Sequence, residues 1–153
     1  MEPRQPTVIT GLTEGWAASK TWTPAALLQR FGDARFRVGS DDDGKAVKLR
    51  LRDFLWYVEH GEAAIDDNPL YLFDRQFEDD EEGLAALLDD YQVPPYFCDD
   101  LFSYVNDEDR PPHRWLIIGP PRSGSALHTD PLQTSAWNAL LCGHKRWVRI
   151  AQP

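Results

Sequence analysis

Cysteine is scarce in this chain of 153 residues, which contains only Cys98 and Cys142. Two cysteines are too few for a disulfide framework and neither belongs to a Cys-x-x-Cys pair, so we expect a reducing compartment; one long-range bridge is the alternative. Long apolar runs are also missing, because no segment approaches the roughly 20 residues of a membrane helix. No apolar signal core follows Met1-Glu2-Pro3-Arg4. These absences predict a nuclear or cytoplasmic protein.

Basic residues are in the minority, with 16 Lys and Arg against 25 Asp and Glu and a net charge of −9. Neutralising nucleic-acid phosphates requires a surplus of cations on one face, so we expect no direct nucleic-acid binding. The short basic stretch Lys45–Arg52 is better explained as a solvated strand face. The acidic clusters could steer a Lys/Arg-rich partner towards the protein or serve only solubility. They are Asp41–Asp43, Glu78–Glu82, Asp99-Asp100 and Asp107–Asp109.

The length is sufficient for one folded domain without staples. A chain of about 150 residues buries roughly 68–70% of its unfolded surface. The sequence contains 42% hydrophobic residues and no internal repeat or low-complexity tract. We therefore expect a single domain over residues 1–153.

The first half predicts a mixture of helices and strands. Thr23 and Pro24 begin a helix that ends near Gly32, because they supply an N-cap and a proline at the first helical position. A second helix is expected over Arg52–His60 and a third over Glu82–Tyr91. Alternating or β-branched runs predict strands at Thr7–Thr10, Phe36–Val38 and Ala46–Leu51, and the apolar run Pro69–Phe73 predicts another. An irregular or short helical layer is expected at Phe97–Val105.

The last forty residues predict closely spaced antiparallel strands joined by tight turns. The expected strands are Trp115–Gly119, Ser125–Asp130, Thr134–Leu141 and Lys145–Ile150. We assign Trp115, Trp137 and Trp147 to the core because large aromatics at alternating positions mostly supply buried area. His113 and His144 are interpreted as structural or surface residues.

His128-Thr129-Asp130 is the sharpest chemical pattern in the sequence. Residues i and i+2 of a strand project from one face, so an imidazole and a carboxylate point at the same place. They would supply two ligands of a 2-His-1-carboxylate triad for Fe(II). The spacing alone is weak evidence, because a surface histidine beside an aspartate is common.

The surroundings of this pattern make it more specific. Residues 119–140, which begin Gly119-Pro120-Pro121-Arg122, and Gly143-His144-Lys145-Arg146-Trp147 form an unusual string. The chain resembles JmjC-domain Fe(II)- and 2-oxoglutarate-dependent oxygenases, in the branch with arginine demethylase and lysyl hydroxylase activity. Upstream segments resemble the same branch in the same order: Glu14-Gly15-Trp16, Trp22-Thr23, Asn68–Asp74, Asp90-Tyr91, Val93-Pro94, Phe97, Asp99–Phe102 and Arg110–Pro112.

This resemblance implies a mainly β fold with flanking α-helices, a cupin-like double-stranded β-helix that is incomplete at the C-terminus. Residues 1–112 would form a helical and strand elaboration, and residues 113–153 the first barrel strands with the His-x-Asp pattern. The implied chemistry is hydroxylation of lysine side chains, or demethylation of N-methyl-arginine or N-methyl-lysine, in a Lys/Arg-rich protein or peptide.

The resemblance also implies roles for individual residues. His128 and Asp130 correspond to two iron ligands. Lys145 would bind the distal carboxylate of 2-oxoglutarate, and Asn138 and Tyr71 would hydrogen-bond this co-substrate. Ser125 stands where the family often has a threonine facing the same pocket. Each residue taken singly also has an ordinary structural explanation: a solvated lysine, an amide satisfying backbone groups, a core tyrosine.

One part of the family pattern has no counterpart. The third iron ligand is a histidine on a later barrel strand, and His144 would replace it only if its turn pointed inward. We therefore expect a piece of a longer oxygenase that is inactive by itself. The alternatives are a non-catalytic cupin-like binding module and, with less support, a small-molecule hydroxylase or sugar-binding cupin.

Overall fold

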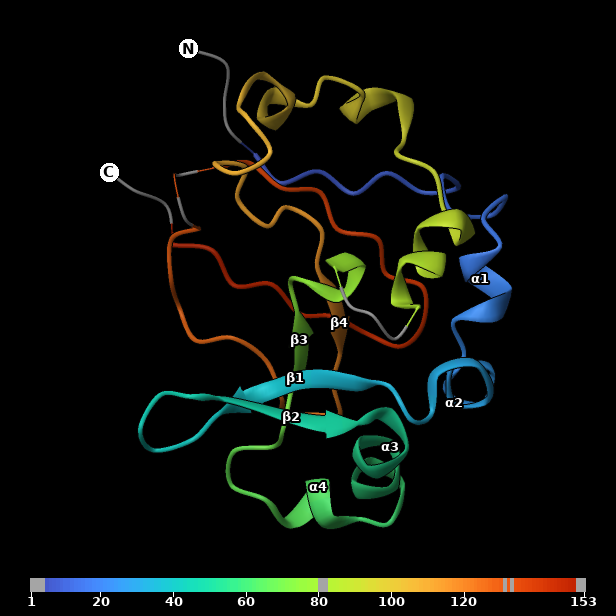
Figure 1. The fold of residues 1–153 in the computed structure, drawn as a ribbon, viewed down its shortest axis with the longest axis vertical. Helices are drawn as coiled ribbons and strands as arrows, with labels where there is room; N and C mark the ends of the chain where they lie inside the picture. Colours follow the sequence, from blue (N-terminus) through green and yellow to red (C-terminus); the bar gives the residue numbers. More distant parts are fainter. Residues whose placement is uncertain (1–4, 80–82, 131, 133, 151–153) are drawn as a thin grey trace.

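Two small antiparallel sheets organise the computed structural model, which describes residues 5–79, 83–130, 132 and 134–150 (Figure 1). β1 (Arg35–Ser40) pairs with β2 (Ala46–Arg50), and β3 (Leu72–Asp74) pairs with β4 (Leu116–Ile118). The register opposes Phe36 with Leu49 in the first sheet and Phe73 with Ile117 in the second. β3 and β4 are thus joined across a large sequence separation, which brings the start of the C-terminal segment to the centre of the molecule.

Hydrogen bonds join the two sheets directly. The Tyr71 amide donates to the Val38 carbonyl at 3.3 Å. The Asp74 carboxylate, which is buried, accepts from the Arg37 amide at 3.0 Å and from the Gln76 amide at 2.9 Å. A buried carboxylate requires such partners, so Asp74 ties the edge of β1 to the end of β3.

The helices begin where local sequence signals predict. α2 (Pro24–Phe31) follows Thr23, whose Oγ1 accepts from the Ala26 amide at 3.3 Å, as an N-cap should. α3 (Leu51–Glu59) buries Leu51, Phe54 and Leu55, with the spacing of one helix face. Two further short helices are α1 (Ala18–Thr21) and α4 (Glu62–Ile65).

The predicted third helix over Glu82–Tyr91 is shorter and tighter than expected. The backbone forms a 3₁₀ helix, η2 (Leu84–Asp90), and Glu82 lies outside the described residues. Gly83 precedes it at φ 77°, and Leu84 and Leu87 are buried three residues apart, which suits three residues per turn. Three other 3₁₀ turns are η1 (Phe77–Asp79), η3 (Pro95–Phe97) and η4 (Leu101–Tyr104); the last two occupy the layer predicted at Phe97–Val105.

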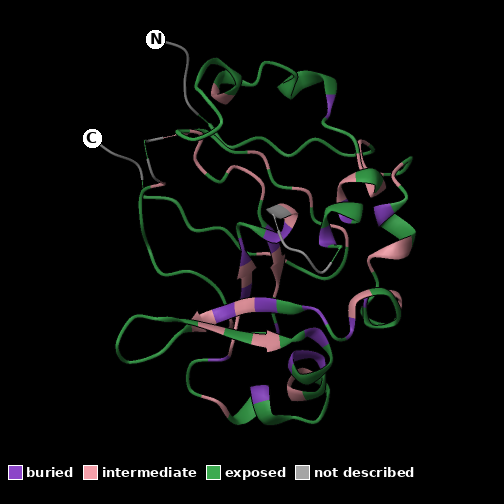
Figure 2. Cartoon of the chain, viewed as in Figure 1, coloured by how far each residue is buried: buried purple, intermediate pink, exposed green. Residues whose placement is uncertain are grey.

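The core lies between the first sheet, α3 and η2 (Figure 2). Its largest fully buried side chains are Phe36, Val38, Leu51, Phe54, Leu72, Leu84 and Leu87. Apart from Pro120, every buried apolar side chain of the described residues falls between Ala18 and Leu116. The accessible surface is 12136 Å², against about 7,900 Å² for a compact monomer of this mass. The described residues after Pro120 are all exposed or half-buried, so this segment adds surface rather than core.

The strands predicted after β4 are not observed among the described residues, so those strand predictions are wrong. The described residues of Ser125–Asp130, Thr134–Leu141 and Lys145–Ile150 follow an irregular path (orange to red in Figure 1), as do those of Thr7–Thr10. Alternating apolar and polar residues place the apolar side chains on one face of a segment. A β-strand also requires a neighbouring strand that accepts its hydrogen bonds. These segments pair with no strand among the described residues, so no closed barrel is present there.

The tryptophan assignments are also partly wrong. Trp147 is 71% exposed and Trp115 is 36% exposed, so neither belongs to the core. Trp137 is half-buried, with its ring stacked on Phe97 at 5.6 Å between centroids and edge-on to Trp16 at 6.3 Å. These two ring contacts place the last segment against Phe97 and against Trp16 near the N-terminus.

Two further observations concern the cysteine pair and the lengths of the helices. Cys98 and Cys142 are exposed free thiols, so the alternative of a bridge between them is wrong. No helix within the described ranges combines the length and apolar character needed to cross a lipid bilayer.

Candidate metal and co-substrate site

The segment that carries the His-x-Asp pattern leaves β4 through a tight turn at Pro120–Ser123. The Ser123 amide donates to the Pro120 carbonyl at 3.2 Å, and the Ser123 hydroxyl donates to the same oxygen at 2.7 Å. Arg122 occupies the third turn position with φ 71°. The turn redirects the backbone from the sheet towards His128.

His128 and Asp130 face each other, although no strand forms there. Nε2 of His128 lies 3.3 Å from Oδ1 of Asp130, and the side chains are 53% and 33% exposed. Nδ1 of His128 lies 2.6 Å from the Ala126 carbonyl oxygen. Because a carbonyl only accepts, Nδ1 carries a proton and donates, which leaves Nε2 as the ring nitrogen that faces the carboxylate.

This arrangement suits a shared cation. Two acceptors at 3.3 Å repel each other unless a proton or metal ion lies between them. Two cis ligands with bonds of about 2.0–2.2 Å stand about 3 Å apart. A metal-bound histidine characteristically donates its other ring N–H to a backbone carbonyl, as His128 does to Ala126. The pair therefore fits two of the three ligands of a facial triad, whereas no group of three His, Cys, Asp or Glu side chains within the described ranges is placed to hold a metal.

Tyr71 stands beside the turn that leads to this pair. Its ring is half-buried, stacks on Phe73 at 6.1 Å between centroids, and lies so close to Gly119 that a Cβ there would meet its Cδ2 at 2.8 Å. Burial raises the pKa of the Tyr71 hydroxyl above its usual value. The hydroxyl is therefore protonated at neutral pH and available as a donor.

Lys145 is the best placed of the other predicted residues for binding an anion. Its Nζ lies over the Trp147 ring at 4.6 Å from the centroid, and burial lowers the pKa of its ammonium group. Within the described part of the chain, no carboxylate pairs with this ammonium. A partly desolvated lysine attracts a carboxylate more strongly than a fully hydrated one.

The predicted residues are only partly brought together. His128 and Asp130 form a pair, whereas Ser125 and Asn138 are exposed. Among the described residues, no hydrogen bond or ion pair joins Ser125, Asn138 or Lys145 to that pair.

Known proteins resemble this chain along almost its whole length. It is 48% identical over 148 residues to the bifunctional arginine demethylase and lysyl-hydroxylase psr-1 of Caenorhabditis elegans, covering 97% of this chain and 36% of the relative. It is 42% identical over 147 residues to the lysine-specific demethylase JMJ21 of Arabidopsis thaliana, covering 96% of this chain and 15% of that protein. The chain is a relative of the JmjC demethylases and hydroxylases.

The name of a more distant relative includes iron and 2-oxoglutarate. The 2-oxoglutarate and iron-dependent oxygenase JMJD4 of Homo sapiens is 28% identical over 163 residues, covering 95% of this chain and 38% of that protein. No family model matches the chain. The chain spans about a third of the length of the first of these relatives. The JmjC resemblance predicted from the residues is therefore confirmed, and the residue roles stay predictions.

Sequence reasoning missed Arg122, the residue that anchors the turn before the JmjC-like pair. Its Nη2 lies within hydrogen-bond distance of the carbonyls of Ala63, Ala64 and Asp66, at 3.2, 2.8 and 2.9 Å. The string Pro120-Pro121-Arg122-Ser123 predicts a turn, but no sequence signal places a guanidinium on α4.

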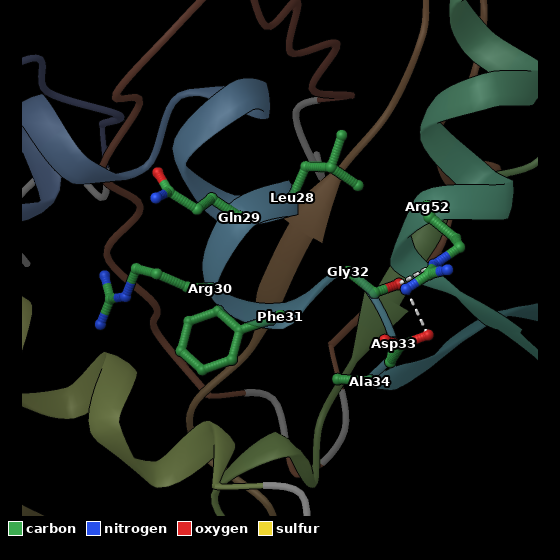
Figure 3. Close-up of a pocket in the computed structure, with 8 residues that line it drawn as sticks. All are labelled: Leu28, Gln29, Arg30, Phe31, Gly32, Asp33, Ala34 and Arg52. Atoms are coloured by element: carbon green, nitrogen blue, oxygen red, sulfur yellow. Dashed lines mark hydrogen bonds and ion pairs between the residues drawn. The ribbon is translucent and has the colours of Figure 1, made fainter.

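The pocket of Figure 3 is a separate feature of the molecule. It lies between the end of α2 and Arg52 of α3 and is lined by residues 28–34 and Arg52. Arg52 forms an ion pair with Asp33 across one side, and its Nε donates to the Gly32 carbonyl at 3.4 Å. It shares no residue with the predicted JmjC site.

Proposed function

We propose that this chain supplies part of an Fe(II)- and 2-oxoglutarate-dependent oxygenase, with His128 and Asp130 as two of the iron ligands. One observation carries the proposal: His128 donates from Nδ1 to the Ala126 carbonyl, and its Nε2 lies 3.3 Å from Asp130 Oδ1. The relatives named as demethylases, hydroxylases and an iron-dependent oxygenase support it. The cupin-like double-stranded β-helix over residues 113–153, preceded by the elaboration over residues 1–112, is part of the same proposal.

Bound iron and 2-oxoglutarate would supply the oxidative chemistry that hydroxylates a C–H bond of the substrate or removes an N-methyl group. His128 and Asp130 would hold the metal through one nitrogen and one carboxylate oxygen. The Ala126 carbonyl would fix the imidazole orientation, because it holds the proton on Nδ1. These residues leave the remaining coordination positions to other ligands.

Lys145, Tyr71, Asn138 and Ser125 are proposed to bind 2-oxoglutarate. Lys145 would leave the Trp147 ring and pair with the distal carboxylate, exchanging a cation–π contact for a charged hydrogen bond. Tyr71 would donate from its protonated hydroxyl. Asn138 and Ser125 would add donors from the exposed segment on either side of the metal pair.

The substrate proposed is a Lys/Arg-rich protein or peptide. The relatives act on arginine and lysine by their names. The net charge of −9 would attract such a substrate from solution. Two exposed free thiols suit a reducing compartment, which supports a nuclear or cytoplasmic location.

Metal binding tests the proposal directly. We expect the protein to bind Mn(II), a redox-stable substitute for Fe(II), and His128→Ala or Asp130→Ala to lower the affinity at least about tenfold. Calorimetry and the Mn(II) magnetic resonance signal would measure it, and succinate formation from 2-oxoglutarate with a basic peptide would measure turnover.

His60→Ala is the matched control. Nδ1 of His60 also lies 3.0 Å from a backbone carbonyl, that of Trp56, but its ring stacks on Trp56 instead of facing a carboxylate. The control should bind Mn(II) like the wild type. Equal binding by wild type and all three variants would refute the assignment of His128 and Asp130.

A non-catalytic binding module is the second candidate. It is favoured by the finding that no three ligating side chains gather within the described ranges. Succinate formation from 2-oxoglutarate in the presence of Fe(II) would exclude the module.

A further inference from the structure

Arg122 connects two parts of the molecule that are far apart in the sequence. Its Nη2 contacts three carbonyl oxygens at the end of α4, those of Ala63, Ala64 and Asp66, at 2.8–3.2 Å. A cation at the C-terminal end of a helical turn meets carbonyls that lack helical partners. The Pro120–Ser123 turn is thereby held on α4.

The backbone at Arg122 is unfavourable for an arginine. Its φ of 71° lies in the left-handed region, which the third position of such a turn requires and glycine adopts most easily. A glycine would form this turn with less strain but would have no side chain to reach α4. The contacts to α4 therefore distinguish arginine from glycine at this position.

Hydrogen bonds connect Asp66, one of the residues that Arg122 contacts, to the segment that carries Tyr71. The Asp66 carboxylate accepts from the Tyr57 hydroxyl at 2.8 Å, and that hydroxyl accepts from the Leu70 amide at 3.1 Å. Leu70 immediately precedes Tyr71. The Arg122 charge and these hydrogen bonds thus meet at Asp66, whose pKa is lowered first by the Asn68 amide and then by the Tyr57 hydroxyl.

The residue before the turn, Gly119, also packs closely against the Tyr71 ring. A Cβ at Gly119 would stand 2.8 Å from Tyr71 Cδ2 and 2.2 Å from Ser123 Oγ, so these groups pack with no room for a methyl group. One end of the turn is thus fixed by Tyr71 and the other by α4. The segment leading to His128 starts from this fixed turn.

We propose that Arg122 is a positioning residue for the metal and co-substrate site. It holds the turn before His128 in a constant relation to Tyr71, through α4 and Asp66. This inference rests on the proposed function, because Arg122 has a positioning role only if His128 and Asp130 bind a metal. Arg122 itself contacts neither metal nor co-substrate.

Arg122→Gly is the informative variant, because it keeps the turn conformation while removing the contacts to α4. We expect Mn(II) affinity to fall about 10- to 100-fold, as when residues supporting metal ligands are lost. Hydrogen exchange should accelerate about tenfold in the peptide over residues 119–130 and at the Leu70 amide. Arg122→Lys should recover only part of either loss, because an ammonium lacks the planar fork of a guanidinium.

Arg75→Gly is the matched control, since it also replaces an exposed arginine by glycine, at the bend after β3. It should leave Mn(II) affinity and exchange over residues 119–130 unchanged. If the wild type binds Mn(II) and Arg122→Gly binds it equally well, the positioning role is wrong while the proposed function stands. Unchanged exchange in Arg122→Gly would likewise overturn the role. If the wild type binds no Mn(II), the proposed function fails, and the role of Arg122 in it fails too.

Discussion

Asp90 offers the clearest test of how the N-terminal helices are held on η2. A single carboxylate oxygen, Oδ2, accepts from Trp22 Nε1 at 2.8 Å and Thr21 Oγ1 at 3.3 Å and pairs with Arg30 Nη1 at 2.5 Å. The Asp90 side chain is only 13% exposed. Removing it leaves the half-buried donors of Thr21 and Trp22 and the more exposed guanidinium of Arg30 without this acceptor.

The loss of stability expected for Asp90→Ala can be worked out from these contacts. The hydrogen bond from Trp22 to a charged acceptor contributes about 1.5–2 kcal/mol, and the partly exposed Arg30 pair adds about 0.5–1 kcal/mol. Thr21 adds little, because its single hydroxyl proton has the Ala17 carbonyl at 3.0 Å as an alternative and closer acceptor. We expect Asp90→Ala to lower the free energy of unfolding by about 2–3 kcal/mol.

Urea unfolding followed by tryptophan fluorescence and circular dichroism would measure this change. Asp89→Ala is the control, because Asp89 is the exposed neighbour on the same 3₁₀ helix. It should change the free energy of unfolding by less than about 0.5 kcal/mol. If Asp90→Ala is no more destabilising than Asp89→Ala, the reasoning about this carboxylate is refuted.

The stabilisation by Asp90 should also depend on pH. Burial raises the pKa of its carboxyl, but hydrogen bonds from Arg30 and Trp22 and the Arg30 charge outweigh burial and hold the pKa below its usual value of 3.8. A group with a lowered pKa in the folded state stabilises the fold fully above its unfolded pKa. The difference between wild type and Asp90→Asn should therefore be constant near neutral pH and shrink as pH falls below 3.8 towards the folded pKa.

Two further substitutions test the turn and the first long helix. Gly119→Ala should destabilise the protein by about 1–3 kcal/mol, because its methyl group would stand 2.2 Å from Ser123 Oγ; Gly15→Ala, with no atom within 4 Å of its added Cβ, is the control in thermal unfolding. Thr23→Ala should lower the free energy of unfolding by about 0.5–2 kcal/mol through loss of the α2 N-cap, and Thr10→Ala at an exposed position is its control. Equal stability of either variant and its control would contradict the contact concerned.

Elements with local signals are predicted closely from the sequence. α2 begins after Thr23 because the cap and proline act within one turn. The β1 and β2 hairpin forms from the two strands predicted at Phe36–Val38 and Ala46–Leu51, and in the turn between them the Asp41 carboxylate accepts from the amides of Asp43 and Lys45 at 3.1 and 2.8 Å. In each case the residues that determine the structure are close neighbours in the sequence.

Elements that depend on distant partners are not predicted. The alternating residues of Lys145–Ile150 indicate a strand, but alternation does not specify which segment would accept its hydrogen bonds. The assignment of Trp147 to the core fails for the same reason, since this side chain is 71% exposed. Sequence spacing alone does not locate the neighbours that bury a side chain.

The candidate site shows both cases. The spacing of His128 and Asp130 predicts their proximity, and they are close, although through an irregular segment and not a strand. The contacts of Arg122 with α4 depend on a fold that brings residues 63–66 beside the turn. Its left-handed φ is equally invisible in the sequence, since a glycine would be the expected residue there.

The separation between the buried core, which ends at Leu116, and the residues proposed for chemistry at 125–145 has a consequence for selection experiments. Substitutions at His128, Asp130 or Lys145 remove little buried apolar area, so they should scarcely change the yield of folded protein. A variant library sorted only for expression would retain them at nearly the starting frequency. Only a sort for bound metal or co-substrate would deplete them, so the ratio of the two enrichments at each position would separate residues required for folding from residues required for the site.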